Sequence, residues 1–240
     1  MGNETVLRER LRNIIKSNKV LYNIAMTVLQ RKPISGGITK DIQGRNNKFQ
    51  SAGTAIFINS KIHIRGNDNE IKIDDYCCFN NVNFLIIGNG NKITISESVK
   101  FGYGGSLHIE DDNCLIDIGD NSTFEDVHIA ATEPGSQILI GRDCMFAYDI
   151  DVRTGDSHSI IDTTTSKRIN HAKNVRIADH VWITAHCTIL KGVEIEKNSI
   201  IATRSVITRS YTQGGIIIGG SPSKILKDNI TWDRKRIIDL

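Results

Sequence analysis

The sequence has few aromatic residues and no long apolar run. Phe, Trp and Tyr make up only 6% of its 240 residues, which suits a core filled by short aliphatic side chains. No apolar run approaches the roughly 20 residues that cross a bilayer, and the N-terminal segment lacks the apolar core of a signal peptide. These absences argue against a membrane-spanning or secreted protein, so we expect a cytoplasmic location.

The cysteines also lack a pattern that would suggest a disulfide framework or a metal site. There are five, an odd number, and their spacing matches no zinc-binding motif. Cys144 and Cys187 occupy small-residue positions of the repeat described below. We interpret all five as reduced residues of a cytosolic protein, and we expect no metal.

Charge is nearly balanced overall but not along the chain. The net charge is +3, from 30 basic and 27 acidic residues; positions 1–40 hold eight basic and two acidic residues, or +6, leaving −3 for the rest. Apolar stripes at helical spacing over 4–31 predict helices. We therefore assign residues 1–40 to a basic helical extension, suited to an anionic polymer or membrane surface; a solvated helix face explains the charge equally well.

A strict six-residue period is the main fold signal. Isoleucine recurs at every sixth position, and small or β-branched residues follow four positions later. The isoleucines are Ile177, Ile183, Ile189, Ile195, Ile201 and Ile207, and the followers are Val181, Cys187, Val193, Ser199 and Ser205. Neither a helix nor a simple strand has this period, so it predicts an all-β hexapeptide-repeat solenoid, a parallel β-helix.

A longer period precedes it. Anchors 22, 23 and 22 residues apart are each followed six positions later by Phe, in the pairs Ile73/Phe79, Ile95/Phe101, Ile118/Phe124 and Ile140/Phe146. Asn and Gly between these pairs predict corners in left-handed backbone conformations. The next anchor comes after 37 residues, so a loop near 153–174 must leave the coil, where function is usually found. We assign 41–220 to the β-helix and 221–240 to a C-terminal cap.

Two motifs give the chain a family resemblance. Asp179-His-Val-Trp182-Ile is similar to the tryptophan-bearing coil of hexapeptide-repeat acyltransferases, and Ile218-Gly-Gly-Ser-Pro-Ser-Lys224 to their closing Gly-x-Pro-Ala-Lys segment. These enzymes are left-handed parallel β-helices that use acetyl-CoA. The sequence most resembles the branch that O-acetylates capsule polysaccharides, including polysialic acid, in which an Asp-x-His-Ser-Ile loop precedes the Trp by 24 residues, as Asp156-Ser-His158 does here. The resemblance covers about 140–230.

The resemblance implies an active site at His158 and Trp182. Acetyl transfer to a hydroxyl needs a base, and imidazole suits that role near neutral pH; a loop histidine without a role is the alternative. Trp182 should point outward from its strand, where a partner subunit, the cofactor or the acceptor would cover it. Asp156 is predicted either to orient the imidazole or only to close the loop turn.

The family likeness also implies a cofactor site. We expect acetyl-CoA to contact Trp182 and Lys224, whose flexible charge suits the phosphates. The family often has Gly where Thr184 follows the Trp-Ile pair, so the remaining contacts are assigned to Ala185, or to Ala202 and Thr203 on the next coil.

The other histidines raise the possibility of zinc, as in a carbonic anhydrase of similar fold. That site needs two His five residues apart, whereas His180 and His186 are six apart. We therefore do not predict zinc binding.

Together these features predict an acetyl-CoA-dependent O-acetyltransferase for a bacterial surface glycan, with His158 as general base. The family likeness implies a homotrimer with active sites between subunits. The basic N-terminal helices would dock an anionic polymer or place the enzyme against capsule machinery at the inner membrane, so we expect a polymeric and anionic acceptor and no nucleic acid. The alternatives are an acetyltransferase for a free sugar, a nucleotide-linked amino sugar or an antibiotic, and a non-catalytic assembly scaffold.

Overall fold

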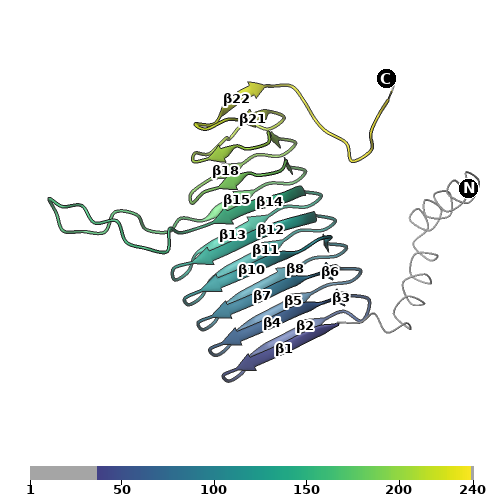
Figure 1. Ribbon diagram of the computed structural model, residues 1–240, viewed down its shortest axis with the longest axis vertical. Coiled ribbons are helices and arrows are strands. Elements are labelled where there is room, and N and C mark those ends of the chain that lie inside the picture. Colours follow the sequence, from purple (N-terminus) through teal and green to yellow (C-terminus); the bar gives the residue numbers. More distant parts are fainter. Residues whose placement is uncertain (1–36, 239–240) are drawn as a thin grey trace, which may run out of the picture.

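The protein is a β-solenoid in the part of the chain that the structure, a computed structural model, describes: residues 37–238. Strands of successive coils pair in parallel, and the coils stack into one column (Figure 1). This confirms the predicted parallel β-helix. The predicted helices over 4–31 lie outside the described residues and stay a prediction. The first strand begins at Ile38, inside the range assigned to the extension.

The column has three faces, and each coil contributes one strand to each face, except that the last coil has only an isolated bridge at Tyr211 on face 2. Face 1 contains β1 (Ile38–Gln43), β4 (Ser60–Arg65), β7 (Val82–Ile87), β10 (Gly105–Glu110), the second parts of β12 (Thr123–Thr132) and β14 (Met145–Arg153), β17 (Thr188–Ile189) and β20 (Val206–Ile207). Face 2 contains β2 (Lys48–Ser51), β5 (Glu70–Ile73), β8 (Lys92–Ile95), β11 (Leu115–Ile118), β13 (Gln137–Ile140), β15 (Val175–Ile177) and β18 (Glu194–Ile195). Face 3 contains β3 (Ile56–Ile58), β6 (Cys78–Asn80), β9 (Lys100–Phe101), the first parts of β12 and β14, β16 (Trp182–Ile183), β19 (Ile200–Ile201) and β21 (Ile217–Gly219).

The repeated apolar residues point into the column and fill it. All six isoleucines of the six-residue period are buried. The phenylalanines of the longer period stack in a row, with ring centroids 5.6 Å apart for Phe79 and Phe101 and 4.4 Å for Phe101 and Phe124. In the next coil Ile183 follows Phe146 in register. The row of phenylalanines therefore ends where the hexapeptide coils begin.

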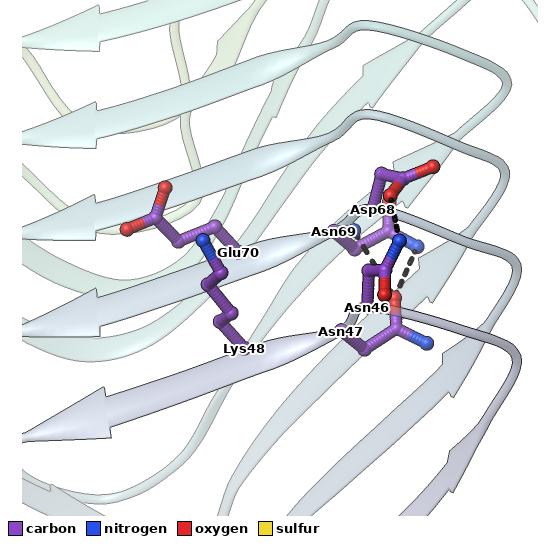
Figure 2. A pocket seen from close by; sticks show the side chains of 6 residues that line it. All are labelled: Asn46, Asn47, Lys48, Asp68, Asn69 and Glu70. Atoms are coloured by element: carbon purple, nitrogen blue, oxygen red, sulfur yellow. Dashed lines mark hydrogen bonds between the residues drawn. The ribbon is translucent and has the colours of Figure 1, made fainter.

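The corner between faces 1 and 2 is stabilised by asparagine side chains. Asn69 donates from Nδ2 to Oδ1 of Asn47 (3.0 Å), and the backbone N–H of Asn91 donates to Oδ1 of Asn69 (3.0 Å). Figure 2 shows the first of these steps, between β2 and β5. Gly88, with φ +136°, completes the turn, and a Cβ there would lie 2.0 Å from the Asp111 carbonyl oxygen. These asparagines therefore act through their side chains, while neighbouring residues adopt the left-handed backbone conformation.

The column ends in a hairpin and a returning tail. β22 (Lys224–Lys227) pairs antiparallel with β21, and the chain then runs back along the side of the column, where Trp232 is buried. The described residues contain no helix long and apolar enough to cross a membrane.

Candidate active site

Residues 154–174, which we call the loop, leave the column between β14 and β15 (Figure 1). Its two arms run antiparallel: the N–H of Ile169 donates to the carbonyl of Ile160 (2.9 Å), and Ile161 bridges to Arg168. The carboxylate of Asp162 accepts the backbone N–H groups of two threonines at the tip. The loop is thus an ordered two-stranded arm.

Asn170 holds the base of this arm together. Its Oδ1 accepts from the N–H of Ile160 (2.7 Å) and from Arg168 Nε (3.1 Å). Its Nδ2 donates to Asp156 Oδ2 (2.9 Å) and to the carbonyl of His158 (2.7 Å). Because Asn170 is buried, these bonds are shielded from water, and they fix the backbone that carries His158.

Two ion pairs fasten the loop to the column. Arg168 donates from both terminal nitrogens to Glu133 (3.0 and 2.5 Å), and Lys191 pairs with Asp156. Burial by itself would raise the pKa of Glu133, but the hydrogen bonds from Arg168 and from the backbone of Ala172, together with the positive charge of Arg168, outweigh it, and the pKa is lowered. The hydrogen bond from Lys191 lowers the pKa of Asp156. Both carboxyl groups are therefore ionised at neutral pH and hold the loop to the column through their ion pairs.

The imidazole of His158 is exposed and makes no hydrogen bond or ion pair to any residue between 37 and 238. The carboxylate of Asp156 faces Lys191 and Asn170 instead. Within one chain Asp156 therefore ties down the loop, and its role in orienting His158 stays a prediction.

Trp182 lies on face 3 and is half-buried. Its neighbours in register are Met145 on one coil and Ile200 on the next. The loop leaves from the corner between faces 1 and 2, and no contact within the described chain joins His158 to Trp182. One chain alone does not bring the two predicted catalytic residues together.

The corner between faces 3 and 1 brings together four of the five predicted cofactor residues, Ala185, Ala202, Thr203 and Lys224, whereas Trp182 lies on face 3. Thr203 Oγ1 donates to the carbonyl of Ala185 (2.7 Å), and the N–H of Ala202 donates to Ile218 of the next coil (2.8 Å). Lys224 pairs with Gly219, which lies against Ala202. Small side chains on successive coils, with an exposed lysine at the end, fit an extended ligand that carries phosphates. The structure thus groups these four residues.

The hydroxyl of Thr184, at the position where the family often has glycine, donates to the carbonyl of Ile201 (2.7 Å). The hydroxyl of Thr184 therefore uses its proton in a bond to the next coil.

Sequence reasoning missed two features at this corner. Arg204 follows Thr203 and is exposed, so it adds positive charge to the cofactor corner. His186 Nδ1 lies 2.6 Å from Asp149 Oδ2, and the ring contacts Tyr148 edge-on at 4.9 Å between centroids. The signal was present: His186 and Asp149 are 37 residues apart, the length of the interrupted coil.

His180 uses the same spacing, with Nδ1 2.7 Å from Asp143 Oδ2. Both histidines that suggested zinc thus face carboxylates of the preceding coil. In the described part of the chain, no group of three or more His, Cys, Asp or Glu side chains is arranged to hold a metal ion.

No known family model matches the sequence. Curated relatives match short stretches. The chain is 40% identical over 65 residues to a 2,3,4,5-tetrahydropyridine-2,6-dicarboxylate N-acetyltransferase of Clostridium perfringens, covering 26% of this chain and 27% of that protein. It is 35% identical over 69 residues to a polysialic acid O-acetyltransferase of Neisseria meningitidis, covering 29% and 32%. The matches thus span about a third or less of these relatives.

Solved structures match over most of the chain. The polysialic acid O-acetyltransferase OatWY has a TM-score of 0.79 and 32% identity, covering 84% of this chain and 94% of that one. The polysialic-acid-specific acetyltransferase NeuO has a TM-score of 0.69 and 27% identity, covering 85% of each chain.

Proposed function

Because the chain belongs to the hexapeptide-repeat acetyltransferases, in the group that contains the polysialic acid O-acetyltransferases, we propose that it O-acetylates a bacterial surface glycan with acetyl-CoA. The acceptor is a capsule polysaccharide, with polysialic acid as the first candidate. The observation that carries this proposal is the likeness to OatWY, at 32% identity over 84% of the chain. The ordered loop that presents His158 supports it.

In the proposed reaction His158 removes the proton from an acceptor hydroxyl as its oxygen attacks the thioester carbonyl carbon. The carbon–sulfur bond then breaks, CoA leaves as a thiolate, and the proton on His158 passes to the sulfur. The products are an O-acetyl ester and CoA, with no covalent enzyme intermediate. The cofactor would lie along Ala185, Ala202, Thr203 and Lys224, a role to which Arg204 adds charge.

We also propose that the active form is a left-handed, homotrimeric β-helix whose sites form between subunits. Two observations support the assembly. His158 and Trp182 do not meet within one chain, and the loop exposes Ile160, Ile161 and Ile169 by 54%, 50% and 61%. Isoleucines so placed on an ordered arm suit contact with a neighbouring subunit. The proposed location is cytoplasmic, at the inner membrane, with residues 1–40 docking on an anionic polymer or on the membrane.

Replacing His158 tests the chemistry. His158→Ala should lower kcat/KM by about 10²–10⁴-fold, the usual contribution of a general base, measured as CoA release with a panel of capsular polymers that includes polysialic acid. His171→Ala, another exposed histidine of the loop, is the matched control and should stay near wild type. Unchanged transfer by His158→Ala would overturn the mechanism. Failure of the wild-type protein to bind CoA in calorimetry would instead favour a scaffold.

A further inference from the structure

The C-terminal tail returns to the candidate active site. Residues 228–234, which we call the strap, run back from β22 along the corner between faces 2 and 3. The N–H of Ile230 donates to the carbonyl of Gly215 (3.0 Å). Two residues later the indole of Trp232 lies 6.1 Å from that of Trp182, at an interplanar angle of 48°. The strap thus places a second tryptophan beside the predicted catalytic one.

Trp232 is fastened to the column by a set of contacts with His180. The two rings stack at 4.1 Å with an interplanar angle of 6°. Trp232 Nε1 donates to the carbonyl of His180 (2.9 Å), and His180 Nε2 lies 3.0 Å from the carbonyl of Trp232. His180 is only two residues before Trp182, so this anchorage places Trp232 against the start of the strand that carries the catalytic indole.

Asp143 and Arg234 complete the anchorage. Asp143 Oδ2 faces His180 Nδ1 (2.7 Å), and Asp143 Oδ1 accepts from Arg234 Nε (2.8 Å). Arg234 also donates to Thr123 Oγ1 (2.8 Å) and to the carbonyl of Cys144 (2.9 Å). Its guanidinium carbon lies 5.6 Å from the Trp232 ring centroid. We call Asp143, His180, Trp232 and Arg234 the strap lock.

The polar and aromatic groups of the strap lock complement one another. A carboxylate and a carbonyl both accept hydrogen bonds, so each ring nitrogen of His180 faces an acceptor. The imidazole stacks on the indole, and the guanidinium of Arg234 lies near the same ring, where a cation is attracted to the aromatic face. Three side chains, those of His180, Arg234 and Asp143, therefore hold the indole of Trp232 in a fixed place.

We propose that Trp232, held by the strap lock, is a positioning residue for Trp182. Trp232 fills the side of Trp182 that adjoins His180, whereas the cofactor corner at Ala185 lies beyond the other end of the strand. The strap therefore blocks movement of the Trp182 indole away from the cofactor corner. The catalytic significance of this contact rests on the proposed function, but the contact itself does not.

Fluorescence tests the contact directly, because the chain has only two tryptophans. In Trp232→Phe and Trp232→Ala, Trp182 is the sole indole. Acrylamide should quench Trp182 severalfold more strongly in Trp232→Ala than in Trp232→Phe, whose ring still fills the space. If Trp232→Ala does not fold, Trp232→Phe combined with Arg234→Gln keeps the ring, weakens the lock and should also raise quenching above that of Trp232→Phe alone.

Kinetics test the positioning role. Trp232→Ala should lower kcat by about tenfold, since small misplacements of active-site groups are costly, while KM for acetyl-CoA stays near wild type. Lys235→Ala, an exposed neighbour, is the control and should change neither quenching nor kcat. Equal quenching in Trp232→Ala and Trp232→Phe, or an unchanged kcat in an active enzyme, would overturn the proposal. A wild-type protein that acetylates no glycan would overturn the proposed function, while the quenching comparison still supports or overturns the contact.

Discussion

The column and the segments that leave it are stabilised in different ways. The column repeats one solution, so that Phe101 or Ile183 has similar apolar neighbours above and below and is fully buried. The loop and the strap depend on contacts that occur once: Asn170 at the base of the loop, and Asp143 and Arg234 at the strap. The apolar column therefore supplies most of the stability. The predicted catalytic groups lie in or beside the loop and the strap, which are held by a few polar contacts that are not repeated along the chain.

Removing one ring from the column should produce the largest loss of stability. Phe101 stacks between Phe79 and Phe124 and is fully buried. Phe101→Ala should therefore lower the free energy of unfolding by about 3–5 kcal/mol, the usual range for a buried Phe, as measured by urea denaturation. Tyr103→Ala, two residues away and 76% exposed, should change it by less than about 0.5 kcal/mol. Equal effects of the two changes would contradict the distinction between the column and its surface.

Removing the hub of the loop should have a smaller and more local effect. Asn170→Ala removes four hydrogen bonds. The N–H of Ile160 and the carbonyl of His158 lose their partner, at a cost of about 1–3 kcal/mol for each group that stays buried, whereas Arg168 and Asp156 keep their ion pairs. The loop should exchange amide hydrogens faster over 156–170 while the strands of the column keep their protection, and kcat should fall with little change in melting temperature. Thr165→Ala at the loop tip is the control. A uniform loss of protection along the chain would show that the loop and the column unfold as one unit.

The sequence predicts the column well because its rule is local and repeated. The isoleucine period from Ile177 to Ile207 and the phenylalanine row identified the inward positions, and the 37-residue gap identified the interrupted coil. The structural role of Asn170 had no such signal, since a single asparagine in a polar loop looks like many others. The contact between Trp232 and His180 joins residues 52 positions apart, and no period predicts where a tail will return.

The candidate site likewise combines residues that the sequence indicated with contacts that it did not. The family resemblance assigned Ala185, Ala202 and Thr203 to the cofactor, and the 18-residue coil brings Thr203 against Ala185. The partners of Asp156 could not be read from the sequence, because Lys191 approaches it from a different coil. Adding the 37-residue offset would have paired Asp149 with His186, so part of what was missed was present in the repeat.

Lowering the pH should loosen the loop before it unfolds the column, and of the effects predicted here this is the smallest. The folded-state pKa values of Glu133 and Asp156 are both lowered. A lowered carboxyl pKa contributes stability that is present at neutral pH and is lost as the pH falls below about 4. The column also carries ion-paired carboxyls with lowered pKa values on its surface, such as Asp151 and Asp179, but its strands are held together mainly by the apolar core, which does not titrate. Lowering the pH from 7 to 3 should therefore reduce hydrogen-exchange protection in the loop by about two- to fivefold, the scale of partly exposed ion pairs, before the column unfolds.

A variant that mimics the protonated state sharpens this test. Glu133→Gln keeps the shape of the side chain but removes the charge that pairs with Arg168, so its loop should be loosened already at pH 7 and should respond less to acid than the wild-type loop. Glu125→Gln, at an exposed carboxyl on a different corner, is the matched control and should keep the wild-type response. If the protection factors of the loop and the column fall together with pH in the wild-type protein, the polar ties do not act independently of the core. The loop and the column would then unfold together, contrary to what their different contacts lead us to expect.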